Sequence, residues 1–440
     1  MKKGVFHNSV LTLIRQVLSI GFGLLATMII ARVLGAEGQG KYTLAILLPT
    51  LLYTLLNSGL SASTVYFIGK GKYTDDEVYS TNLLSSLLLS TFSMLFGGLI
   101  VLFFKEHFFE ELASQLLLYT LLILPLIFLQ RNLQTIFHGK EEFEKFNLIV
   151  ILNQFGLLFF SFVFLYVLDL GLTGAIFSFA SSQLLMLFAS FYFLRQSYGL
   201  FRPKKYSIQY LKEGFTFGLK GHLSNVLSFV NYRIDMFLIA YFIDDVAVGI
   251  YSIAVLLVER VWLVSQSIST VLFARVANLN TNFERNRFTS LAARNTFFIT
   301  ILVGLFLAIF SHWIIIILFG DEYVNSIIPF LYMIPGVVIF SLGKVLANDF
   351  TGRGYPEINT YIAFLVALTN FGLNIWLIPI FGIKGAALAT SVSYILDTCI
   401  KSVVFSIKNK VSILDIFLIK MSDFQLYKTE LLKFYKLIKR

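Results

Sequence analysis

Residues 295–318 read NTFFITILVGLFLAIFSHWIIIIL, a run of 24 residues without a single Asp, Glu, Lys or Arg. An α-helix rises 1.5 Å per residue, so roughly 20 apolar residues cross the ~30 Å hydrocarbon core of a bilayer. This run is therefore long enough and apolar enough to form a transmembrane helix. Similar runs, separated by charged or turn-rich breaks, recur along the whole chain.

Eleven further runs have the same character, which predicts an all-α polytopic membrane protein of about 12 transmembrane helices. The twelve runs lie near 9–33, 43–68, 80–104, 113–136, 147–168, 171–194, 216–241, 246–273, 295–318, 325–347, 358–380 and 383–406. The composition agrees with this interpretation, since 57% of the 440 residues are hydrophobic and 14% are charged. A soluble domain carries roughly 25% charged residues and could not hide this much apolar surface.

The first run is predicted to be a span and not a cleaved signal peptide, because it is too long for the apolar part of a signal peptide and contains Arg15. The single cysteine, Cys399, excludes an internal disulfide and a cysteine-only metal site. The chain contains no glycine-rich phosphate loop ending in Lys-Ser or Lys-Thr. We therefore expect no cofactor and no metal.

The basic residues predict the orientation of the spans. If the N-terminus is cytoplasmic, 27 Lys and Arg residues fall in inside loops or at the adjoining span ends, Arg131 and Lys344 among them. Only Arg32, Lys41, Lys105 and Lys384 fall outside. The positive-inside rule then places both termini in the cytoplasm and the protein in the cytoplasmic (inner) membrane. This bias accounts for the net charge of +10 without a nucleic-acid partner.

The two halves of the chain resemble each other. Three segments recur in the same order at nearly one offset: 30–45 as 239–254, 137–140 as 350–353, and 171–175 as 382–386. Six spans per repeat is an even number, so both repeats enter the membrane in the same direction. Such parallel repeats predict two six-helix bundles around a central cavity, an architecture of transporters.

The repeat sets the expected domain boundaries. We expect an N-terminal bundle at 1–195, a cytoplasmic linker at 196–213 and a C-terminal bundle at 214–406. Residues 407–440 are too charged to span and combine many lysines with spaced apolar residues. They are predicted to form a basic amphipathic helix on the anionic inner leaflet.

Ionisable side chains inside spans are costly unless they face a cavity or a partner, so each is a candidate functional residue. One helical face of the seventh span carries Lys220, Ser224, Ser228, Asn231 and Asp235, at spacings of 4, 4, 3 and 4. The candidate substrate-binding residues are Arg15, Lys220, Arg233, Arg260 and Asn231. The candidate ion-coupling residues are Asp235 and Glu259, because a carboxylate can titrate or take sodium.

Structural alternatives stay open for several of these residues. Lys220 can reach the cytoplasmic interface with its long side chain, and Arg233 and Asp235 can pair with other helices. Asp397 and Lys401, four residues apart, are expected to form a structural ion pair. The four cations among the candidates outnumber the two acids, which favours an anionic substrate such as a pyrophosphate-linked or acidic glycan.

Two motifs carry a family resemblance. The stretch Ile29–Tyr42, which reads IIARVLGAEGQGKY, resembles the first-loop signature of the polysaccharide transporter family, which includes the O-antigen flippases. The stretch Tyr232–Ile239 followed by Val248–Tyr251 resembles its second-half signature, with the Arg-x-Asp pair Arg233 and Asp235 in place. The family belongs to the multidrug/oligosaccharidyl-lipid/polysaccharide exporter superfamily, and the resemblance covers residues 10–406.

The resemblance implies a flippase, not an enzyme. Its substrate would be an undecaprenyl-pyrophosphate-linked oligosaccharide, moved to the outer leaflet and driven by an H⁺ or Na⁺ gradient. Membrane lipid, and a polysaccharide polymerase machinery, are the further partners that it implies. Lipid II flippases of the superfamily usually have two more C-terminal helices, which residues 407–440 are too charged to provide.

Three alternatives differ in function class. A drug or small-cation antiporter of the same fold would be expected to have a more acidic cavity. A membrane-embedded glycan-processing enzyme would need a sizeable outer loop or an acidic catalytic pair, for which Glu106, Glu110 and Glu111 in the outer loop at 104–113 are the candidates. A non-transporting scaffold of a polysaccharide synthase complex would not need the buried charges.

Overall fold

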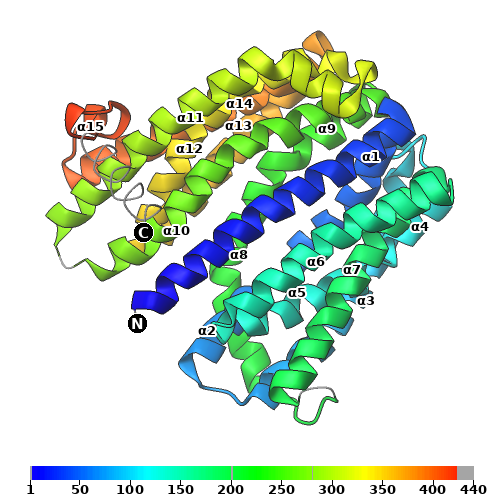
Figure 1. Ribbon diagram of the computed structural model, residues 1–440, viewed down its shortest axis with the longest axis horizontal. Helices are drawn as coiled ribbons and strands as arrows, with labels where there is room; N and C mark the ends of the chain where they lie inside the picture. The colour runs from blue at the N-terminus through cyan, green and yellow to red at the C-terminus, as the bar shows by residue number, and fades with distance from the viewer. Residues whose placement is uncertain (1, 200–201, 280, 424–440) are drawn as a thin grey trace, which may run out of the picture. The chain divides into compact units, whose positions relative to one another are not determined.

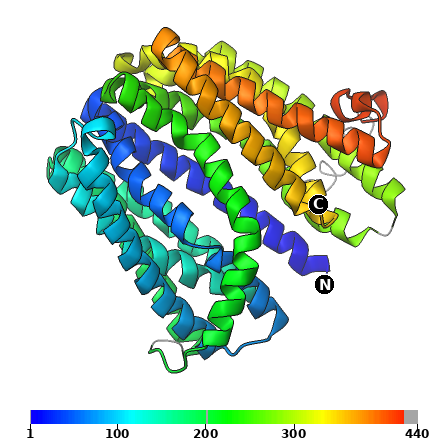
Figure 2. The same ribbon diagram turned by 180° about the vertical axis from the view of Figure 1, so that it is seen from behind.

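The computed structural model describes residues 2–199, 202–279 and 281–423, except the side chains of 2–14, 220, 269–271, 273–275, 277 and 278. All regular secondary structure in this part of the chain is helical (Figure 1, Figure 2). The elements are α1 (Lys2–Leu56), α2 (Leu60–Lys70), α3 (Asp75–Phe108), α4 (Ser114–Leu121), α5 (Leu124–Gly139), α6 (Phe143–Ser161), η1 (Phe162–Val167), α7 (Gly171–Tyr198), α8 (Ile208–Phe242), α9 (Asp245–Val258), η2 (Glu259–Val261), α10 (Trp262–Asn278), α11 (Asn282–Phe319), η3 (Asp321–Ser326), α12 (Ile327–Gly352), α13 (Pro356–Phe381), α14 (Ile383–Asn409) and α15 (Ile413–Phe417).

The helices follow the predicted spans closely. Ten helices of the described chain are long and apolar enough to cross a membrane. The 55-residue α1 is far longer than one span, and it is divided at Gly35, where φ is 68° and ψ is −176°. A positive φ suits glycine, which has no Cβ to clash. With this division, and with the 35-residue α8 over the predicted seventh span, the structure is consistent with twelve spans.

The distribution of side chains is that of a protein dissolved in lipid. Large apolar side chains such as Leu102, Phe103 and Ile317 are 66–74% exposed. Polar side chains are buried instead, including a row of serines on the inner face of α3. Small residues on such faces let helices approach closely. The protein is a multi-pass membrane protein.

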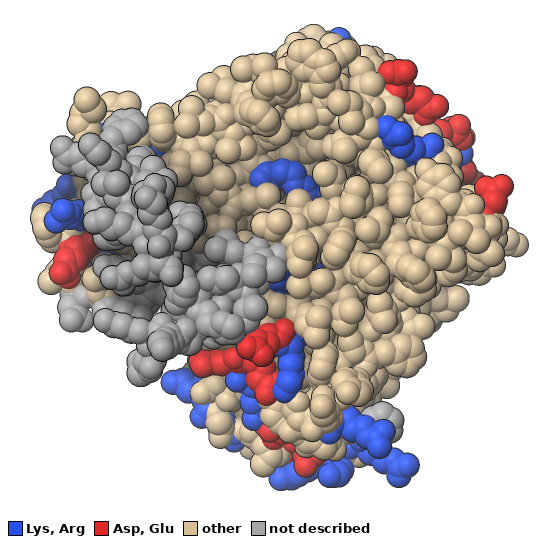
Figure 3. Space-filling model, in the orientation of Figure 1, with Lys and Arg blue, Asp and Glu red and all other residues tan. Residues whose placement is uncertain are grey.

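The chain divides into two compact units. Unit 1 comprises residues 1–252 and 315–324, and unit 2 comprises 253–314 and 325–440. In unit 1, charged side chains gather at the end where α2 meets α3 and at the opposite end near α4, with a broad band of mostly uncharged residues between (Figure 3). Ion pairs at the first end join Lys72 to Glu213 and Lys140 to Asp75, both at 2.5 Å.

Two glycines at equivalent positions of the repeat bring unit 1 helices into backbone contact. Gly40 lies in the second segment of α1, and Gly249 lies in α9. A Cβ on Gly40 would collide with the carbonyl of Asp245, and a Cβ on Gly249 would collide with the carbonyl of Ala36. The offset of 209 seen in the sequence relates Gly40 to Gly249 and Ala36 to Asp245. We call these four residues the glycine crossing, in which Ala36 and Gly40 have the small-xxx-small spacing of closely packed membrane helices.

Contacts around the glycine crossing also follow the repeat. Arg32 donates hydrogen bonds to the carbonyls of Ile317 and Leu318, at 2.5 and 2.9 Å, in the last turn of α11. A cation suits the unpaired carbonyls at a helix C-terminus. Tyr241, 209 residues after Arg32, stacks instead on His107 in the last turn of α3. Arg32 and Tyr241, at equivalent positions of the two repeats, thus contact the last turns of α11 and α3. This correspondence supports the predicted internal repeat.

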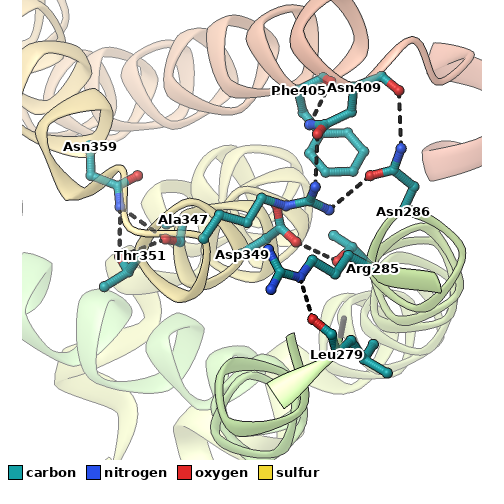
Figure 4. Close-up of polar contacts among 11 residues, drawn as sticks. Leu279, Arg285, Asn286, Ala347, Asp349, Thr351, Asn359, Phe405 and Asn409 are labelled. Atoms are coloured by element: carbon teal, nitrogen blue, oxygen red, sulfur yellow. Dashed lines mark hydrogen bonds and ion pairs between the residues drawn. The ribbon is translucent and has the colours of Figure 1, made fainter. Parts of the chain in front are cut away.

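A network of hydrogen bonds ties three helices of unit 2 together near the ends of α12 and α14 (Figure 4). Arg353, whose side chain is 5% exposed, pairs with Asp349 at 2.7 Å and donates to Asn409 at 2.8 Å and to Asn286 at 2.9 Å. Asp349 also accepts a hydrogen bond from Thr289 of α11 at 2.6 Å. Asp349 lies fully buried inside α12.

The C-terminal segment is fastened to α11 as far as it is described. Ile416 of α15 is fully buried, and Phe417 packs edge-on against Phe297. Beyond α15, Asp423 accepts two hydrogen bonds from Arg294, at 2.5 and 2.7 Å. The rest of the predicted amphipathic tail, 424–440, lies outside the described residues.

We expect Asp423→Asn to lower the stability of the protein in detergent by about 3 kcal/mol at pH 7, because it leaves the buried Arg294 without its countercharge. The hydrogen bonds from Arg294 lower the pKa of Asp423. A lowered pKa stabilises the fold above the ordinary value of about 4, and that stabilisation is lost as pH falls through the lowered value. The difference in Tm between the two proteins, measured from pH 7 to pH 3, should therefore narrow toward the acid end. A constant difference in Tm over this range would contradict the assignment.

Candidate functional site

Asp235 is the most buried of the predicted site residues whose side chains the structure describes. It lies in α8, is 1% exposed, and accepts a hydrogen bond from the Tyr251 hydroxyl at 2.6 Å. Its other carboxylate oxygen accepts from the backbone N–H of Met236 at 2.9 Å. Tyr251 belongs to α9, so this contact joins α8 to the helix that follows it. A buried carboxylate that accepts hydrogen bonds from oriented donors interacts strongly with them, because the local dielectric constant is low.

Asn231 and Arg233 lie on the same stretch of α8. Asn231 is one turn before Asp235 and 6% exposed, and its Oδ1 is buried without a hydrogen-bond partner. A buried amide oxygen that accepts no hydrogen bond costs free energy. A ligand that donates a hydrogen bond to Asn231 Oδ1 would recover it. Arg233 is half-buried, and its Nη1 donates to the carbonyl of Tyr232 at 3.0 Å.

The stripe on α8 is positioned by contacts with the first helices of the chain. Gly218 of α8 and Gly59, which precedes α2, are so close that a Cβ on either would collide with the backbone of the other. One turn further, His222 Nε2 lies 2.9 Å from the carbonyl of Leu55. Gly59 has a φ of 73°, a conformation that favours glycine. These contacts fix the rotation of α8 and hence the direction of its polar stripe.

Arg15 and Lys220 complete the predicted cations of unit 1. Arg15 lies in the first segment of α1, is half-buried, and has a buried Nε without a hydrogen-bond partner. The backbone of Lys220 lies in α8, but its side chain is outside the described residues.

Glu259 and Arg260 lie in unit 2, at a break in the helix. The turn η2 (Glu259–Val261) is a 3₁₀ segment between α9 and α10, within a membrane-length run. Short 3₁₀ segments inside longer helices frequently mark functional positions. Both side chains are half-buried, and the Nε of Arg260 is buried without a hydrogen-bond partner. The Nε–H group of Arg260 can therefore donate a hydrogen bond to an acceptor on a ligand.

The structure adds two cations that the sequence analysis placed at cytoplasmic span ends. Arg131 lies inside α5, and Lys344 lies inside α12, each two turns before the end of its helix. Lys344 is half-buried with its ammonium 4.0 Å from the ring centre of Trp262. Both positions are compatible with the predicted span ends, whose cytoplasmic location stays a prediction. Both cations belong with the ionisable residues inside spans.

The predicted site residues thus fall on three elements. Asn231, Arg233 and Asp235 come together on α8, and Glu259 and Arg260 come together on η2. Arg15 stands alone on α1. The predicted structural ion pair of Asp397 and Lys401 is confirmed, with contacts of 2.7 and 2.9 Å. No cluster of three or more metal-ligating residues exists in the described chain.

A family model with the description "Polysaccharide biosynthesis protein" matches residues 5–280, which is more than half of the chain. The chain belongs to this family. The matched part contains both motifs that carried the resemblance, and it contains the α8 stripe and η2.

Two similar proteins match most of this chain. A protein of Shigella flexneri named "Putative O-antigen transporter" is 24% identical over 408 residues, covering 89% of this chain and 94% of the relative. A protein of Staphylococcus aureus named "Capsular polysaccharide biosynthesis protein CapF" is 23% identical over 395 residues, covering 86% of this chain and 94% of the relative.

Solved structures establish the fold. The lipid II flippase MurJ in its inward closed conformation aligns with a TM-score of 0.77 and 20% identity, covering 92% of this chain and 89% of that one. An inward-facing multidrug resistance MATE family transporter of the MOP superfamily aligns with a TM-score of 0.70 and 16% identity, covering 88% and 94%. The predicted all-α polytopic fold is therefore confirmed.

Proposed function

We propose that this chain is a flippase that moves an undecaprenyl-pyrophosphate-linked oligosaccharide repeat unit across the cytoplasmic membrane. Its membership of the polysaccharide biosynthesis family and its polar side chains inside membrane-length helices support this function together. The family match alone is compatible with other roles in polysaccharide synthesis. The α8 stripe carries the argument, because a buried Asp235 and an unsatisfied Asn231 inside a span have a cost that a transport function explains.

The candidate cations favour an anionic headgroup as substrate. Arg15 and Arg233 lie in the long helices α1 and α8, Arg260 lies in η2 within a membrane-length run, and Lys220 lies in α8. Arginine grips phosphate or carboxylate oxygens with two parallel donors. The unpartnered Nε atoms of Arg15 and Arg260 leave such donors available. A pyrophosphate-linked glycan supplies the matching acceptors, and its lipid tail stays in the bilayer.

Ion coupling is assigned to the two carboxylates, Asp235 and Glu259. Each lies in a helical run that crosses the membrane under the predicted topology, and each has polar neighbours. Binding of H⁺ or Na⁺ to a buried carboxylate changes its charge and its hydrogen bonds, which biases a conformational equilibrium. Alternating access of two six-helix bundles would convert this bias into transport.

The proposal makes the protein a transporter and not an enzyme. It acts in the cytoplasmic membrane, with both termini in the cytoplasm. Its partners are the lipid-linked oligosaccharide, the coupling ion and membrane lipid, and it hands its product to a polysaccharide polymerase machinery on the outer side.

Complementation of a flippase-null bacterium tests the proposal. Surface glycan and the lipid-linked repeat units trapped inside are measured in cells that express the wild type, Arg233→Ala or the control Arg195→Ala, whose side chain is exposed at the end of α7. We expect surface glycan to return with the wild type and the control, and trapped repeat units to persist with Arg233→Ala. Normal surface glycan with Arg233→Ala would overturn the substrate-binding role of Arg233. No rescue across a panel of repeat-unit pathways, together with raised drug resistance, would replace the flippase by a drug exporter.

A further inference from the structure

Two aromatic rings on neighbouring helices of unit 1 stack face to face and remain exposed. Tyr66 of α2 and Phe217 of α8 have ring centres 4.2 Å apart and an interplanar angle of 18°. The two residues are 41% and 37% exposed. Phe67, which is 5% exposed, packs edge-on against both rings, with centre distances of 5.2 and 6.1 Å. We call Tyr66 and Phe217 the aromatic platform.

The helices that carry the aromatic platform are fixed to each other on both sides of it. Gly218, the residue after Phe217, lies so close to the backbone of Gly59 that neither glycine could carry a Cβ. Two turns before Phe217, the hydroxyl of the buried Tyr210 lies 2.9 Å from Thr64 Oγ1 of α2. The two rings are therefore preorganised, and a ligand that stacks on them has little side-chain order to impose.

The surface around the aromatic platform differs from a lipid-facing one. The exposed positions one turn to either side of Tyr66 on α2 are Ala62, Gly69 and Lys70. A Cβ on Gly69 would meet open space. The outer side of α3 instead exposes one leucine at every second turn, Leu88, Leu95 and Leu102, at 60–74%. Exposed aromatic rings with a few polar groups beside them, and without large aliphatic neighbours, are typical of a site that a polar ligand reaches.

The aromatic platform continues the polar stripe of α8. Phe217 precedes Ser224 by seven residues and Asp235 by eighteen, which are close to two and five whole turns of an α-helix. Its side chain therefore shares a helical face with the stripe. Under the predicted topology it lies at the cytoplasmic end of that face, so a substrate that enters from the cytoplasm meets the aromatic platform before it meets Asp235.

The chemistry of the aromatic platform suits the ring of a sugar. The face of an aromatic ring carries partial negative charge, and the C–H groups of a pyranose ring carry partial positive charge, so the two attract each other when stacked. Hydroxyl groups at the sugar edge need donors and acceptors. Lys70, whose ammonium lies 5.9 Å from the Tyr66 ring centre, and Glu213, one turn before Phe217, supply both beside the rings.

We infer that the aromatic platform of Tyr66 and Phe217 is a sugar-binding subsite, on which a pyranose ring of the lipid-linked glycan stacks as it enters from the cytoplasm. The inference rests on the proposed function and deepens it, because it assigns a contact to the uncharged sugar part of the substrate. Stacking depends on the C–H face of a ring and not on one particular hydroxyl. The subsite therefore positions the glycan and accepts several kinds of hexose.

A tryptophan in the aromatic platform provides an optical readout. Phe217→Trp keeps an aromatic ring against Tyr66, and subtracting the same titration of the wild type removes the signal of the three native tryptophans. The purified full-length protein, in a detergent without a sugar headgroup, is titrated with glucose, with N-acetylglucosamine and with rhamnose. Sorbitol, a polyol without a ring, is the control. We expect a saturable change in emission with at least one of the three sugars and none with sorbitol.

Substitutions at Tyr66 then test whether the sugar stacks. In the Phe217→Trp protein, Tyr66→Leu should abolish the response or weaken binding at least 10-fold, because leucine is apolar but has no aromatic face. Tyr66→Phe should retain most of the response. Tyr192→Leu, which removes a tyrosine that is 62% exposed in α7 of the same unit, is the matched control and should leave binding unchanged. No saturable response to any sugar, an equal response to sorbitol, or equal binding after Tyr66→Leu would overturn the inference.

A transport assay separates failure of the subsite from failure of the proposed function. In the complementation system, Tyr66→Leu and Phe217→Leu should each reduce surface glycan at least 10-fold at equal membrane levels, whereas Tyr66→Phe and Tyr192→Leu should retain most of it. Normal glycan with both leucine variants, but loss with Arg233→Ala, would reject the subsite and leave the flippase standing, with the two rings as packing or lipid-facing groups. Absence of rescue by the wild type would reject the flippase, whereas the fluorescence titration would still show whether the rings bind a sugar.

Discussion

Asp235→Asn is expected to reduce flipping by about 10- to 100-fold while the protein still inserts into the membrane. The Asn side chain has nearly the same shape but no negative charge. In the wild type the Tyr251 hydroxyl donates a hydrogen bond to the charged carboxylate at 2.6 Å. A hydrogen bond to a charged group contributes about 1.5–3 kcal/mol, which corresponds to this range of rate. Asn also cannot bind or release a coupling proton. The measurement is uptake of a labelled lipid-linked oligosaccharide across proteoliposomes with and without an imposed ion gradient.

The two roles of Asp235 give different results in that assay. If Asp235 couples ion and substrate, the variant should lose its dependence on the gradient as well as its rate. If Asp235 only fastens α8 to α9, Tyr251→Phe should reproduce the whole defect, and the gradient dependence should persist in both variants. Asp169→Asn is the matched control, because Asp169 is exposed in the connection before α7 and its φ of 49° suits Asn equally well. A defect of similar size in the control would reject the assignment.

Positions of the spans could be read from the sequence because lipid imposes a simple rule. A backbone inside the bilayer must satisfy its own hydrogen bonds, so every apolar run of sufficient length becomes a helix. The run at 295–318 accordingly lies within α11, and the run at 383–406 lies within α14. The helices extend past several of these runs, however. α11 begins at Asn282, because polar residues at a membrane surface remain helical when they are capped and packed.

These extensions explain which candidate residues the sequence missed. Lys344 and Arg131 stand near the ends of apolar runs, where a basic residue is usually an interfacial anchor. Only packing shows that Lys344 lies over Trp262, more than 80 residues away in the chain. The α8 stripe was easier to find, since its members follow one another at helical spacing on a single helix. Contacts between distant segments leave no periodic signal in one sequence.

The contact between the two stretches of the glycine crossing could not be predicted from the sequence for the same reason, although the repeat made the two stretches recognisable. The motif around Gly40 and its counterpart around Gly249 were visible as similar stretches. That the two stretches pack against each other follows only from the structure, where each glycine abuts the backbone of the other stretch. Similarity of two segments indicates equivalent places in two repeats, and contact between them is additional information.

Cross-linking Gln39→Cys to Ser252→Cys is expected to abolish transport, and cleavage of the link by a reductant is expected to restore it. Gln39 Nε2 lies 3.5 Å from Ser252 Oγ, beside the glycine crossing. These residues belong to different repeats and lie toward the side predicted to face outside. Alternating access requires this side to open in each cycle, so a covalent link would hold the protein in one state. A short reducible bis-methanethiosulfonate reagent in a Cys399→Ser background makes the link specific.

A second pair with the same separation isolates the effect of joining the repeats. Asn153 Nδ2 lies 3.5 Å from Gln183 Oε1, and both residues belong to the N-terminal repeat, on α6 and α7. Linking Asn153→Cys to Gln183→Cys should leave transport within about twofold of the unlinked protein, because packed helices of one bundle move as a body. Loss of transport with both pairs would indicate damage by the reagent or rigidity in general. Continued transport with the Gln39–Ser252 link complete would mean that the glycine crossing stays closed throughout the cycle, and the opening would then have to occur elsewhere in the protein.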